Sequence, residues 1–598
     1  MQEYTSPGEI EVSLEENLTD SLWQMAEEHP ERPAVSHRVG DGFVDWPTRR
    51  FVDEVRAVAK GLMAAGVEQG DRVCIYSSTR LEWTVLDFAI WAAGAVSVPI
   101  YETSSPEQIE WIFQDSGAVA MILEGPELQH TFDAVADRLT TCQHVWSIDE
   151  GALEHLRTGG GDVSDDELTA RASSVTGQDT ATIVYTSGTT GRPKGCVITH
   201  HNFVWDAEQV AEAAKEFFKP EKRTLLFLPL AHIFARVIQT TCIRNGVKLG
   251  FSTGIPQLVE ELQLYQPDFI LAVPRVFEKV YNGARQKAHA DGKGAIFDRA
   301  AAVAEAYSRQ QAAGNVALLT KIQHALFDKL VYGKLRAAMG GQVGYAVSGG
   351  AALGERLGHF FNGIGVTILE GYGLTETTAG ACLGRPSAFQ VGTVGRPVPG
   401  ASVRIADDGE ILLKGGNIFV GYYNNPEATA EMLDDDGWFH TGDLGQVDGQ
   451  GFVRITGRKK EILVTASGKN VAPAVLEDRM RAHALVSQSM VVGDGQPFIA
   501  ALITIDPEAF PAWAEANGKE GEQVADLVDD EDLRVEIQKA VDEANTAVSR
   551  AESIRAFRIL PDDFVVGVEL SQKMSVKRHV VSEKYKDVIE ALYAGVEH

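Results

Sequence analysis

The sequence predicts an α/β protein with two parts. One is a large, multi-subdomain N-terminal domain with mixed parallel sheets and a β-rich subdomain. The other is a small, mobile α+β C-terminal domain. Three observations predict this arrangement. The chain has 598 residues, too many for one hydrophobic core. Helix and strand patterns alternate over the first part of the chain. After residue 400 short strands and turn residues take over, and a last segment has the usual size of one small domain.

The first part of the chain alternates amphipathic helices with short apolar strands. Residues 51–65 have the periodicity of an amphipathic helix, and residues 72–77 and 94–100 are predicted to form buried strands. Similar strands are expected at 224–228, 269–273 and 343–347. This alternation predicts parallel strands joined by crossover helices.

Residues 280–340 differ from their surroundings, because they are rich in Ala, Lys, Gln and Arg. Apolar residues recur there at helical spacing: Leu319, Ile322, Leu326 and Leu330. We expect a pair of long helices inserted between two strands. Three lysines lie on the same stretch, Lys321, Lys329 and Lys334. They favour a solvated helix face, with contact to a membrane surface as the alternative.

Beyond residue 400, turn residues separate short strands. Asp407-Asp408-Gly409 and Asp448-Gly449 are hairpin signals. Residues 457–460 then connect this β-rich part to strands expected at 489–492 and 498–504 and a helix at 531–547. We therefore expect an N-terminal domain over 1–457, with the helical insertion at about 280–340, and a C-terminal domain over 458–598.

Composition limits the kinds of partner. The net charge of -30, from 84 acidic and 54 basic side chains, argues against nucleic acid, since phosphate binding needs a basic footprint. The five cysteines form no CxxC pair, which favours a reducing compartment.

The N-terminus is acidic and polar, unlike a secretory signal. No apolar run reaches the ~18 residues of a spanning helix, so membrane contact is expected to be peripheral at most. The expected location is the cytoplasm, with association at the inner face of the membrane as an option. The expected state is monomer or homodimer.

The segment TIVYTSGTTGRPKG, at 182–195, carries the strongest chemical signal. An apolar strand enters a loop of Thr, Ser and Gly that closes with Lys194. Glycines let backbone N–H groups converge on one anion, while hydroxyl groups and an ammonium group add donors and charge. A polyphosphate site is predicted from these residues: Thr186, Ser187, Gly188, Thr189, Thr190, Gly191 and Lys194. The loop lacks the Gly-Lys-Ser/Thr of a Walker A motif. A plain flexible turn is the alternative.

Further motifs follow in order: LPLAH at 228–232, SGGAAL at 348–353, EGYGLTET at 370–377, GWFHTGDLG at 437–445 and GRKKEILVTASGKNVAP at 457–473. With the first motif, they make the chain resemble the adenylate-forming superfamily of acyl-CoA synthetases, adenylation domains and luciferases over nearly its whole length. The tract VPIYETSSPEQIEWI and the helical insertion are similar to the long-chain acyl-CoA synthetases. The resemblance implies the adenylate-forming enzyme fold.

The resemblance also implies roles for residues of EGYGLTET and SGGAAL. Glu370, Gly371 and Tyr372 belong to the nucleotide loop, where Tyr372 can stack on adenine. Thr375 is expected to hydrogen-bond the α-phosphate. Glu376 is the expected Mg²⁺ ligand, assisted by Thr189, since Mg²⁺ on phosphates uses one or two protein oxygens. Gly350 is expected to line the adenine and acyl pockets.

Other roles lie farther along the chain. Asp443 is implied to bind the ribose hydroxyls with Arg458. Lys460 reaches the nucleotide or serves the hinge, with an interdomain salt bridge as the alternative. His232 gates the carboxylate pocket, or is a satisfied core histidine. After a rotation about 457–460, Gly468 and Lys469 are expected to reach a tunnel for the CoA pantetheine arm.

The C-terminus departs from the family pattern. The family has a lysine three residues before an arginine, where it stabilises the leaving pyrophosphate. Counting back from Arg578 gives Ser575, with Lys573 and Lys577 two residues to either side. A two-residue step keeps the same face of a strand, so Lys573 is preferred over Lys577.

The resemblance implies an ATP- and Mg²⁺-dependent long-chain fatty acid:CoA ligase, with ATP, Mg²⁺ and coenzyme A required for turnover. Four alternatives remain open: a fatty acyl-AMP ligase that delivers to a carrier protein, a ligase for medium-chain or other carboxylic acids, a peptide-synthetase adenylation domain, and a non-catalytic nucleotide-binding regulator. The chain lengths accepted are not fixed by the sequence.

Overall fold

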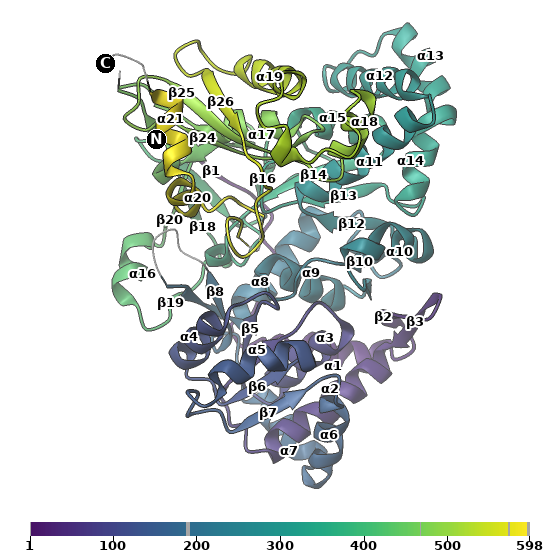
Figure 1. The fold of residues 1–598 in the computed structure, drawn as a ribbon. Coiled ribbons are helices and arrows are strands. Elements are labelled where there is room, and N and C mark those ends of the chain that lie inside the picture. Colours follow the sequence, from purple (N-terminus) through teal and green to yellow (C-terminus); the bar gives the residue numbers. More distant parts are fainter. Residues whose placement is uncertain (1, 187–191, 467, 572–573, 595–598) are drawn as a thin grey trace.

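The structure, a computed structural model, describes residues 2–186, 192–466, 468–571 and 574–594. It is a mixed α/β protein with a large N-terminal part and a small C-terminal part (Figure 1). No helix within these ranges is both long and apolar enough to cross a bilayer.

A seven-stranded sheet forms the lower half of the molecule in Figure 1, with the order β19-β9-β8-β5-β4-β6-β7. Its strands are β4 (Arg72–Tyr76), β5 (Val96–Ile100), β6 (Ala120–Leu123), β7 (His144–Ser147), β8 (Thr180–Thr186), β9 (Lys194–Thr199) and β19 (Gly421–Tyr422). The strands from β8 to β7 are parallel, whereas β9 is antiparallel to β8. Along β4, Val73 and Ile75 join one hydrophobic cluster and Cys74 joins another on the opposite face. Helices on both faces explain why this strand is buried and apolar after Arg72.

Seven helices accompany this half of the fold: α1 (Asp20–Glu28), α2 (Thr48–Ala64), α3 (Leu81–Ala92), α4 (Pro106–Ser116), α5 (Pro126–Ala136), α6 (Ala152–Gly159) and α7 (Asp165–Ser173). The helix α3 is buried almost completely between the sheet and α2, which is why its sequence LEWTVLDFAIWA is apolar nearly all round. The helix α2 is amphipathic and agrees closely with the helix predicted at 51–65.

Two further sheets stand beside the first. One has the order β12-β13-β14-β15-β16, from β12 (Phe269–Ala272), β13 (Tyr345–Ser348), β14 (Thr367–Tyr372), β15 (Cys382–Leu383) and β16 (Arg396–Pro397). The other has the order β10-β11-β2-β3, from β10 (Arg223–Leu226), β11 (Lys248–Phe251), β2 (Pro33–Val39) and β3 (Gly42–Pro47). The helices of this region are α8 (His200–Ala213), α9 (Ile233–Arg244), α10 (Leu258–Tyr265) and α15 (Glu355–Gly363).

The helical insertion lies between the parallel neighbours β12 and β13. It contains α11 (Pro274–Ala290), α12 (Gly294–Ala312), α13 (Leu318–Phe327), a π-helical turn (Asp328–Tyr332) and α14 (Gly333–Ala338). The expectation of a single pair of helices was therefore wrong. Glycines with positive φ at Gly292 and Gly314 separate the first three helices.

An antiparallel sheet forms the β-rich part, with the order β1-β17-β18-β20-β21. Its strands are β1 (Gln2–Thr5), β17 (Ser402–Ile405), β18 (Glu410–Lys414), β20 (Phe439–Val447) and β21 (Val453–Arg458), and α16 (Pro426–Met432) lies beside it. Both predicted hairpins are present, since β17 pairs with β18 and β20 with β21.

The C-terminal part is built on the sheet β24-β25-β26, from β24 (Val486–Val492), β25 (Ile499–Ile505) and β26 (Ile554–Ile559). A small hairpin, β22 (Leu463–Val464) and β23 (Asn470–Val471), precedes it, and its helices are α17 (Pro473–Arg481), α18 (Phe510–Ala516), α19 (Glu531–Asn545), α20 (Arg578–Lys584) and α21 (Lys586–Tyr593). Alternate residues of β25 enter two different hydrophobic clusters, both made only of residues from this part.

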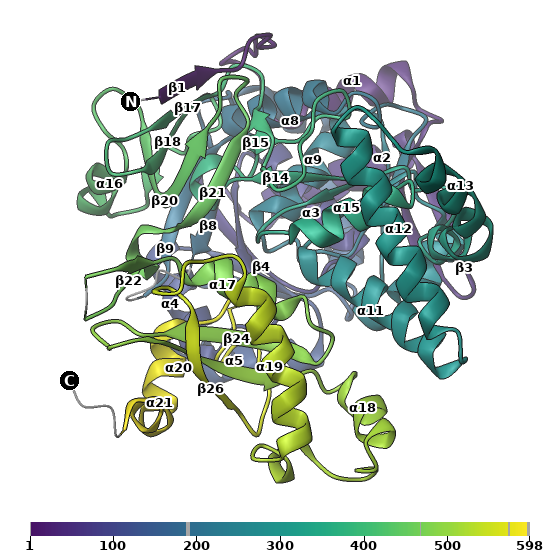
Figure 2. The ribbon, with the colours of Figure 1, turned by 90° about the horizontal axis from the view of Figure 1, so that it is seen from above.

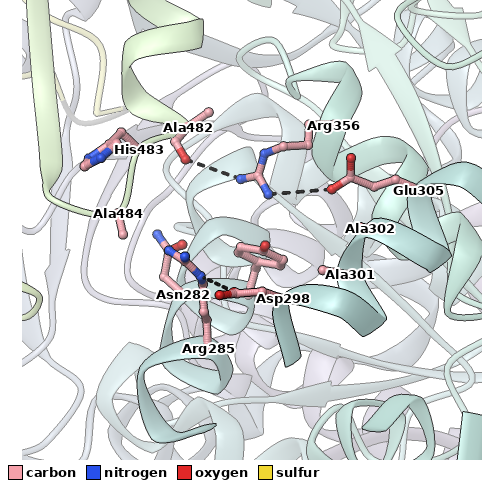
Figure 3. A pocket seen from close by; sticks show the side chains of 11 residues that line it. Asn282, Arg285, Asp298, Ala301, Ala302, Glu305, Arg356, Ala482, His483 and Ala484 are labelled. Carbon is pink, nitrogen blue, oxygen red and sulfur yellow. Dashed lines mark hydrogen bonds and ion pairs between the residues drawn. The ribbon is translucent and has the colours of Figure 1, made fainter. Parts of the chain in front are cut away.

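Among the described residues, three polar contacts join the C-terminal part to the helical insertion and α15. Arg275 pairs with Asp506 at 2.8 Å and Lys279 with Glu508 at 2.9 Å. Arg356 donates to the carbonyl of Ala482 at 3.3 Å. A cavity of about 430 Å³ lies at this contact (Figure 3).

Candidate functional site

The hairpin of β8 and β9 carries the segment predicted to bind phosphate. Thr186 and Lys194 are cross-strand partners where the two strands meet the turn. The predicted phosphate ligands Ser187, Gly188, Thr189, Thr190 and Gly191 lie outside the described residues, so their roles stay predictions. The register nevertheless places Lys194 at the turn end of the hairpin, where an ammonium group can serve an anion held by the turn.

Tyr422 connects Lys194 to Glu376. The short strand β19 pairs with β9, and Tyr422 stands opposite Cys196. The Lys194 ammonium group lies 5.0 Å from the centre of the Tyr422 ring, within the range of a cation–π contact. The Tyr422 hydroxyl donates to Glu376 Oε1 at 2.7 Å. Burial and the Glu376 carboxylate raise the pKa of Tyr422, so the phenol remains a donor at neutral pH.

The loop that carries Glu376 has a constrained backbone. A β-carbon on Gly373 would lie 1.9 Å from the carbonyl oxygen of Ala379, so only glycine fits there. Thr378 and Ala379 have φ values of 49° and 71°, which are unfavourable for residues with a side chain. This strain persists only if neighbouring groups hold the turn in place.

Asn417 supplies that support. Its side-chain amide donates to the carbonyls of Thr377 at 3.1 Å and Gly380 at 3.0 Å, and its backbone carbonyl accepts from the Thr378 hydroxyl at 2.8 Å. Asn417 is almost completely buried. It is therefore a positioning residue for the turn next to Glu376, and it was missed in the sequence together with Tyr422.

A second cluster joins Tyr372, Asp443 and Arg458. The Tyr372 hydroxyl donates to Asp443 Oδ2 at 2.6 Å, and Arg458 Nε donates to Asp443 Oδ1 at 2.9 Å. Asp443 and Arg458 face each other across β20 and β21, so strand register brings them together. Burial and the Asp443 carboxylate raise the pKa of Tyr372. The cluster can accept hydrogen bonds from a diol at Asp443 while Arg458 balances the charge.

The ends of β13 and β14 place the remaining predicted residues of the nucleotide pocket. Glu370 accepts from the backbone N–H of Leu353 at 3.2 Å, and burial raises its pKa to about 7. Gly371 pairs with Leu383 across β14 and β15. Gly350 follows β13 with φ of +82°. Thr375 begins a 3₁₀ turn (Thr375–Thr377) and is buried.

His232 begins α9. Its Nδ1 accepts from the backbone N–H of Phe234 at 3.1 Å, which caps the helix. The Phe234 ring in turn packs against Gly349, where a β-carbon would lie only 3.3 Å from it. The structure therefore gives His232 a structural contact as a helix cap beside the SGGA segment, and its role as a gate stays a prediction.

A buried ion pair joins α9 to α3, and its arginine also bonds to strands β5 and β8. Arg236 and Asp87 are fully buried and pair at 2.7 Å. Arg236 also donates to the hydroxyls of Thr182 on β8 and Ser97 on β5, both at 2.6 Å. These bonds satisfy a charge that would otherwise be costly to bury. The network was also missed in the sequence.

The predicted residues of the C-terminal part are exposed in this arrangement. Lys460 lies in a 3₁₀ turn (Lys459–Glu461), and Gly468 and Lys469 lie in the turn between β22 and β23. The Lys469 ammonium group lies 3.4 Å from Glu552 of the same part. These residues are not brought into the Glu376 and Asp443 clusters by any contact among the described residues.

The terminal segment gives Lys577 a partner. Its ammonium group donates to the carbonyl of Gly567 at 2.7 Å, and Arg578 pairs with Glu477 at 2.6 Å. Ser575 is exposed. Lys573 lies outside the described residues, so the preference for it stays a prediction.

The donor set around Glu376 suits a magnesium ion that is shared with phosphate. No group of three or more His, Cys, Asp or Glu side chains converges on a metal position among the described residues. Mg²⁺ on a nucleotide needs only one or two protein oxygens and keeps several waters. Glu376 alone can supply such a carboxylate oxygen.

The cavity in Figure 3 lies elsewhere, between the helical insertion, α15 and residues 482–484. Its arginines already have partners. Arg285 pairs with Asp298 at 2.8 Å, and Arg356 lies over the ring of Tyr281 and 3.9 Å from Glu305. The cavity is therefore a gap at the contact between the two parts of the chain and not an unfilled anion site.

Two family models match the chain. The family described as AMP-binding enzyme matches residues 22–423, and the AMP-binding enzyme C-terminal domain matches residues 460–597. The chain is 49% identical to long-chain-fatty-acid–CoA ligase FadD15 of Mycobacterium bovis, over 99% of this chain and 100% of the relative. It is 30% identical to long chain acyl-CoA synthetase 7, peroxisomal, of Arabidopsis thaliana, over 97% and 86%.

Solved structures share the fold. The A domain of carboxylic acid reductase from Segniliparus rugosus, in complex with AMP and a co-purified carboxylic acid, aligns with a TM-score of 0.74 at 21% identity, covering 97% of this chain and 94% of that one. The anthranilate CoA ligase AuaEII, in complex with anthranoyl-AMP, aligns with a TM-score of 0.72 at 18% identity, covering 97% and 99%.

Proposed function

Because the chain belongs to the AMP-binding enzyme family, we propose that it is an ATP- and Mg²⁺-dependent long-chain fatty acid:CoA ligase. In the first half-reaction a fatty acid and ATP give an acyl-adenylate and pyrophosphate. In the second, coenzyme A takes the acyl group and AMP leaves. The names of the relatives support this proposal, since the full-length relative at 49% identity is a long-chain-fatty-acid–CoA ligase.

The observation that carries the proposal is the junction of Lys194, Tyr422 and Glu376 at the turn end of the β8–β9 hairpin. A cation and a carboxylate lie on either side of one tyrosine, beside a loop rich in backbone donors and hydroxyl groups. The same chain segment leads from Tyr372, in the Asp443 cluster, to Glu376 within four residues. One loop can therefore hold the ribose and phosphate ends of a nucleotide.

In the adenylation step, a carboxylate oxygen of the fatty acid attacks the α-phosphorus. A bond from oxygen to this phosphorus forms, and the bond to the bridging oxygen of pyrophosphate breaks. Lys194 stabilises the charge on the phosphates, Thr375 orients the α-phosphate, and Asp443 with Arg458 holds the ribose. Glu376 and Thr189 would hold magnesium, which would further neutralise the charge of the phosphates. Catalysis is then mostly positioning and charge stabilisation.

In the second step, the CoA thiolate attacks the acyl carbonyl carbon and AMP leaves with its phosphate oxygen. We place the domain boundary at 457/458 and infer that the C-terminal domain rotates about 457–460, so that Gly468 and Lys469 approach the pantetheine arm. Lys459 now pairs with Glu410 at 3.1 Å and with Asp408. These two ion pairs must break or rearrange during the rotation.

The experiment that tests the proposal measures pyrophosphate release with fatty acids of increasing length, with and without CoA. Lys194→Ala and Glu376→Ala are expected to lower pyrophosphate release at least about 100-fold, the size of effect seen when one transition-state donor is removed. Lys215, an exposed lysine just after α8, provides the matched control, and Lys215→Ala should keep wild-type rates. Wild-type release from both site variants would remove the proposed phosphate site.

The same assay separates the alternatives. A fatty acyl-AMP ligase would release pyrophosphate without consuming CoA, and a medium-chain ligase would prefer shorter acids.

We further propose that the enzyme works in the cytoplasm as a monomer or homodimer, with peripheral contact to the inner face of the membrane. Gel filtration with light scattering measures the oligomeric state directly.

A further inference from the structure

The helix α13 presents an apolar face to solvent. Leu318 and Leu319 are 74% and 66% exposed, more than any other large apolar side chain among the described residues. Ile322 and Leu326 follow at 59% and 56%, and Leu330, in the π-helical turn after α13, is 50% exposed. Leu318, Ile322 and Leu326 are four residues apart, so they stand in one row on the helix. We call these five side chains the α13 face.

Contacts on the opposite side of α13 keep this face exposed. The ring of His324 stacks on Tyr307 of α12 at 3.9 Å, and its Nε2 lies 2.6 Å from the carbonyl of Gly363. Phe327 is buried, and the Tyr332 hydroxyl donates to the carbonyl of Ala300 at 2.7 Å. Because these contacts fix the rotation of α13, the leucines cannot turn inward.

The charge around the face is positive, although the whole chain carries -30. Residues 314–338 contain four basic side chains, Lys321, Lys329, Lys334 and Arg336, and a single acidic one, Asp328. Asp328 is paired with Arg336 at 2.7 Å, and this guanidinium lowers its pKa. The three lysines are exposed. Exposed leucines and isoleucine flanked by lysines are the pattern of a helix that lies on an anionic bilayer.

The position of α13 suits such contact. It lies at the outer edge of the molecule, beyond α12, in both views of the ribbon (Figures 1 and 2). At about 1.5 Å per residue it is far shorter than the hydrocarbon core of a bilayer is thick, so it can lie along the surface but not span it. The large negative charge elsewhere acts weakly there, because charges beyond about 8 Å are screened at physiological salt.

From these observations we propose that the α13 face binds the surface of a membrane that contains anionic lipids, with its leucines in the interface and its lysines at the headgroups. A second copy of this chain fits the face less well. A symmetric contact through α13 would bring the lysines of both copies together, and like charges oppose that pairing.

The proposal deepens the peripheral membrane contact proposed above, because it names the surface that makes the contact, and it stands on the geometry of α13. Only the benefit of membrane binding rests on the proposed ligase activity. A long-chain fatty acid partitions into bilayers, so an enzyme held there meets its substrate at a high local concentration. Membrane binding is accordingly tested without ATP, CoA or fatty acid, so that failure of the ligase proposal leaves the result readable.

The test is sedimentation of the full chain with sucrose-loaded vesicles of phosphatidylcholine alone or with about one third phosphatidylglycerol. The wild type should bind the anionic vesicles, and less so at high salt. The triple variant L318Q/I322Q/L326Q should bind at least about tenfold more weakly, since each methylene withdrawn from the interface weakens binding about fourfold. V535Q, which replaces an apolar side chain of α19 that is 57% exposed, is the matched control and should bind like the wild type.

The second variant, K321Q/K329Q, tests the electrostatic part. It should lose about fivefold in affinity per lysine and most of the salt dependence. All substituted positions are exposed, and an unchanged unfolding midpoint confirms that the variants are folded. Two results would overturn the proposal: no binding of the wild type to anionic vesicles, or equal binding of the wild type and the triple variant. A triple variant that changes only the oligomeric state in light scattering would assign the face to a second copy instead.

Discussion

Replacing Asn417 by alanine removes the two hydrogen bonds that its amide donates to the carbonyls of Thr377 and Gly380. Each buried carbonyl left without a donor costs about 1–3 kcal/mol. The left-handed backbone at Thr378 and Ala379 stores about 1–3 kcal/mol per residue, and this strain is released when the turn relaxes. The two effects act in the same direction. The turn beside Glu376 should therefore change its conformation in the variant.

A misplaced Glu376 weakens the transition state for adenylation. A loss of about 2.7 kcal/mol corresponds to about a 100-fold fall in kcat/KM for ATP. The assay is the initial rate of palmitate-dependent pyrophosphate release over a range of ATP and Mg²⁺ concentrations. Asn545→Ala is the control, because Asn545 also donates to and accepts from one backbone residue, Ile554, but does so in the C-terminal part. It should lower stability and leave this rate within about twofold.

A rescue experiment separates positioning from general stability. Glycine adopts a positive φ without steric cost, so Ala379→Gly removes part of the strain that Asn417 opposes. Adding Ala379→Gly to Asn417→Ala should recover about fivefold in rate, which is about 1 kcal/mol. The reasoning is refuted if Asn417→Ala keeps wild-type rates, or if the added glycine lowers activity further.

Three other predictions follow from the structure. Burial raises the pKa of Glu370 to about 7 in the folded state. The free energy of unfolding of the wild type should therefore fall, relative to Glu370→Gln, by up to about 3 kcal/mol as pH rises from about 4.5 through 7. Urea unfolding at pH 5 and pH 8 measures this difference. Asp87→Ala leaves the buried Arg236 charge unpaired and should cost about 3–5 kcal/mol; adding Arg236→Met should restore a large part of the unfolding midpoint, and no restoration would contradict the pairing argument. Lys573→Ala should slow pyrophosphate release more than Lys577→Ala, because Lys577 is bonded to the carbonyl of Gly567, and the reverse order would correct the register.

Much of the fold was predictable because it depends on local pattern. The apolar runs near 72, 94 and 269 are strands in the structure, each within two residues of the predicted ends. Asp408-Gly409 and Asp448-Gly449 lie in the connections between paired strands, as turn chemistry predicts. The predicted fold class is confirmed by the mixed sheets and by the fold shared with the A domain of carboxylic acid reductase.

The helical insertion shows what pattern cannot decide. Helical spacing of Leu319, Ile322 and Leu326 predicts a helix but not which way the apolar row points. The outward orientation follows from the stacking of His324 on Tyr307 and from the buried Tyr332, contacts that depend on where α12 lies. The sequence favoured a solvated helix face that carries the lysines. The structure exposes these lysines, and it exposes the apolar side chains of the helix as well.

Contacts between motif residues were predictable from the sequence, whereas contacts from segments distant in the chain were not. Asp443 and Arg458 come from two motifs and meet as cross-strand partners. Tyr422 reaches Glu376 from 46 residues away, and Asn417 reaches Thr377 from 40. No spacing rule links such positions in a single sequence. The roles given to all the predicted site residues stay predictions.

The most direct test of the account is ATP–pyrophosphate exchange in the absence of CoA. Exchange requires that the enzyme form the acyl-adenylate reversibly. It therefore isolates the step assigned to Lys194, Glu376 and the β8–β9 hairpin. In the wild type, exchange should depend on a long-chain fatty acid, and Lys194→Ala should abolish it. Exchange without fatty acid, or equal exchange in the variant, would contradict it.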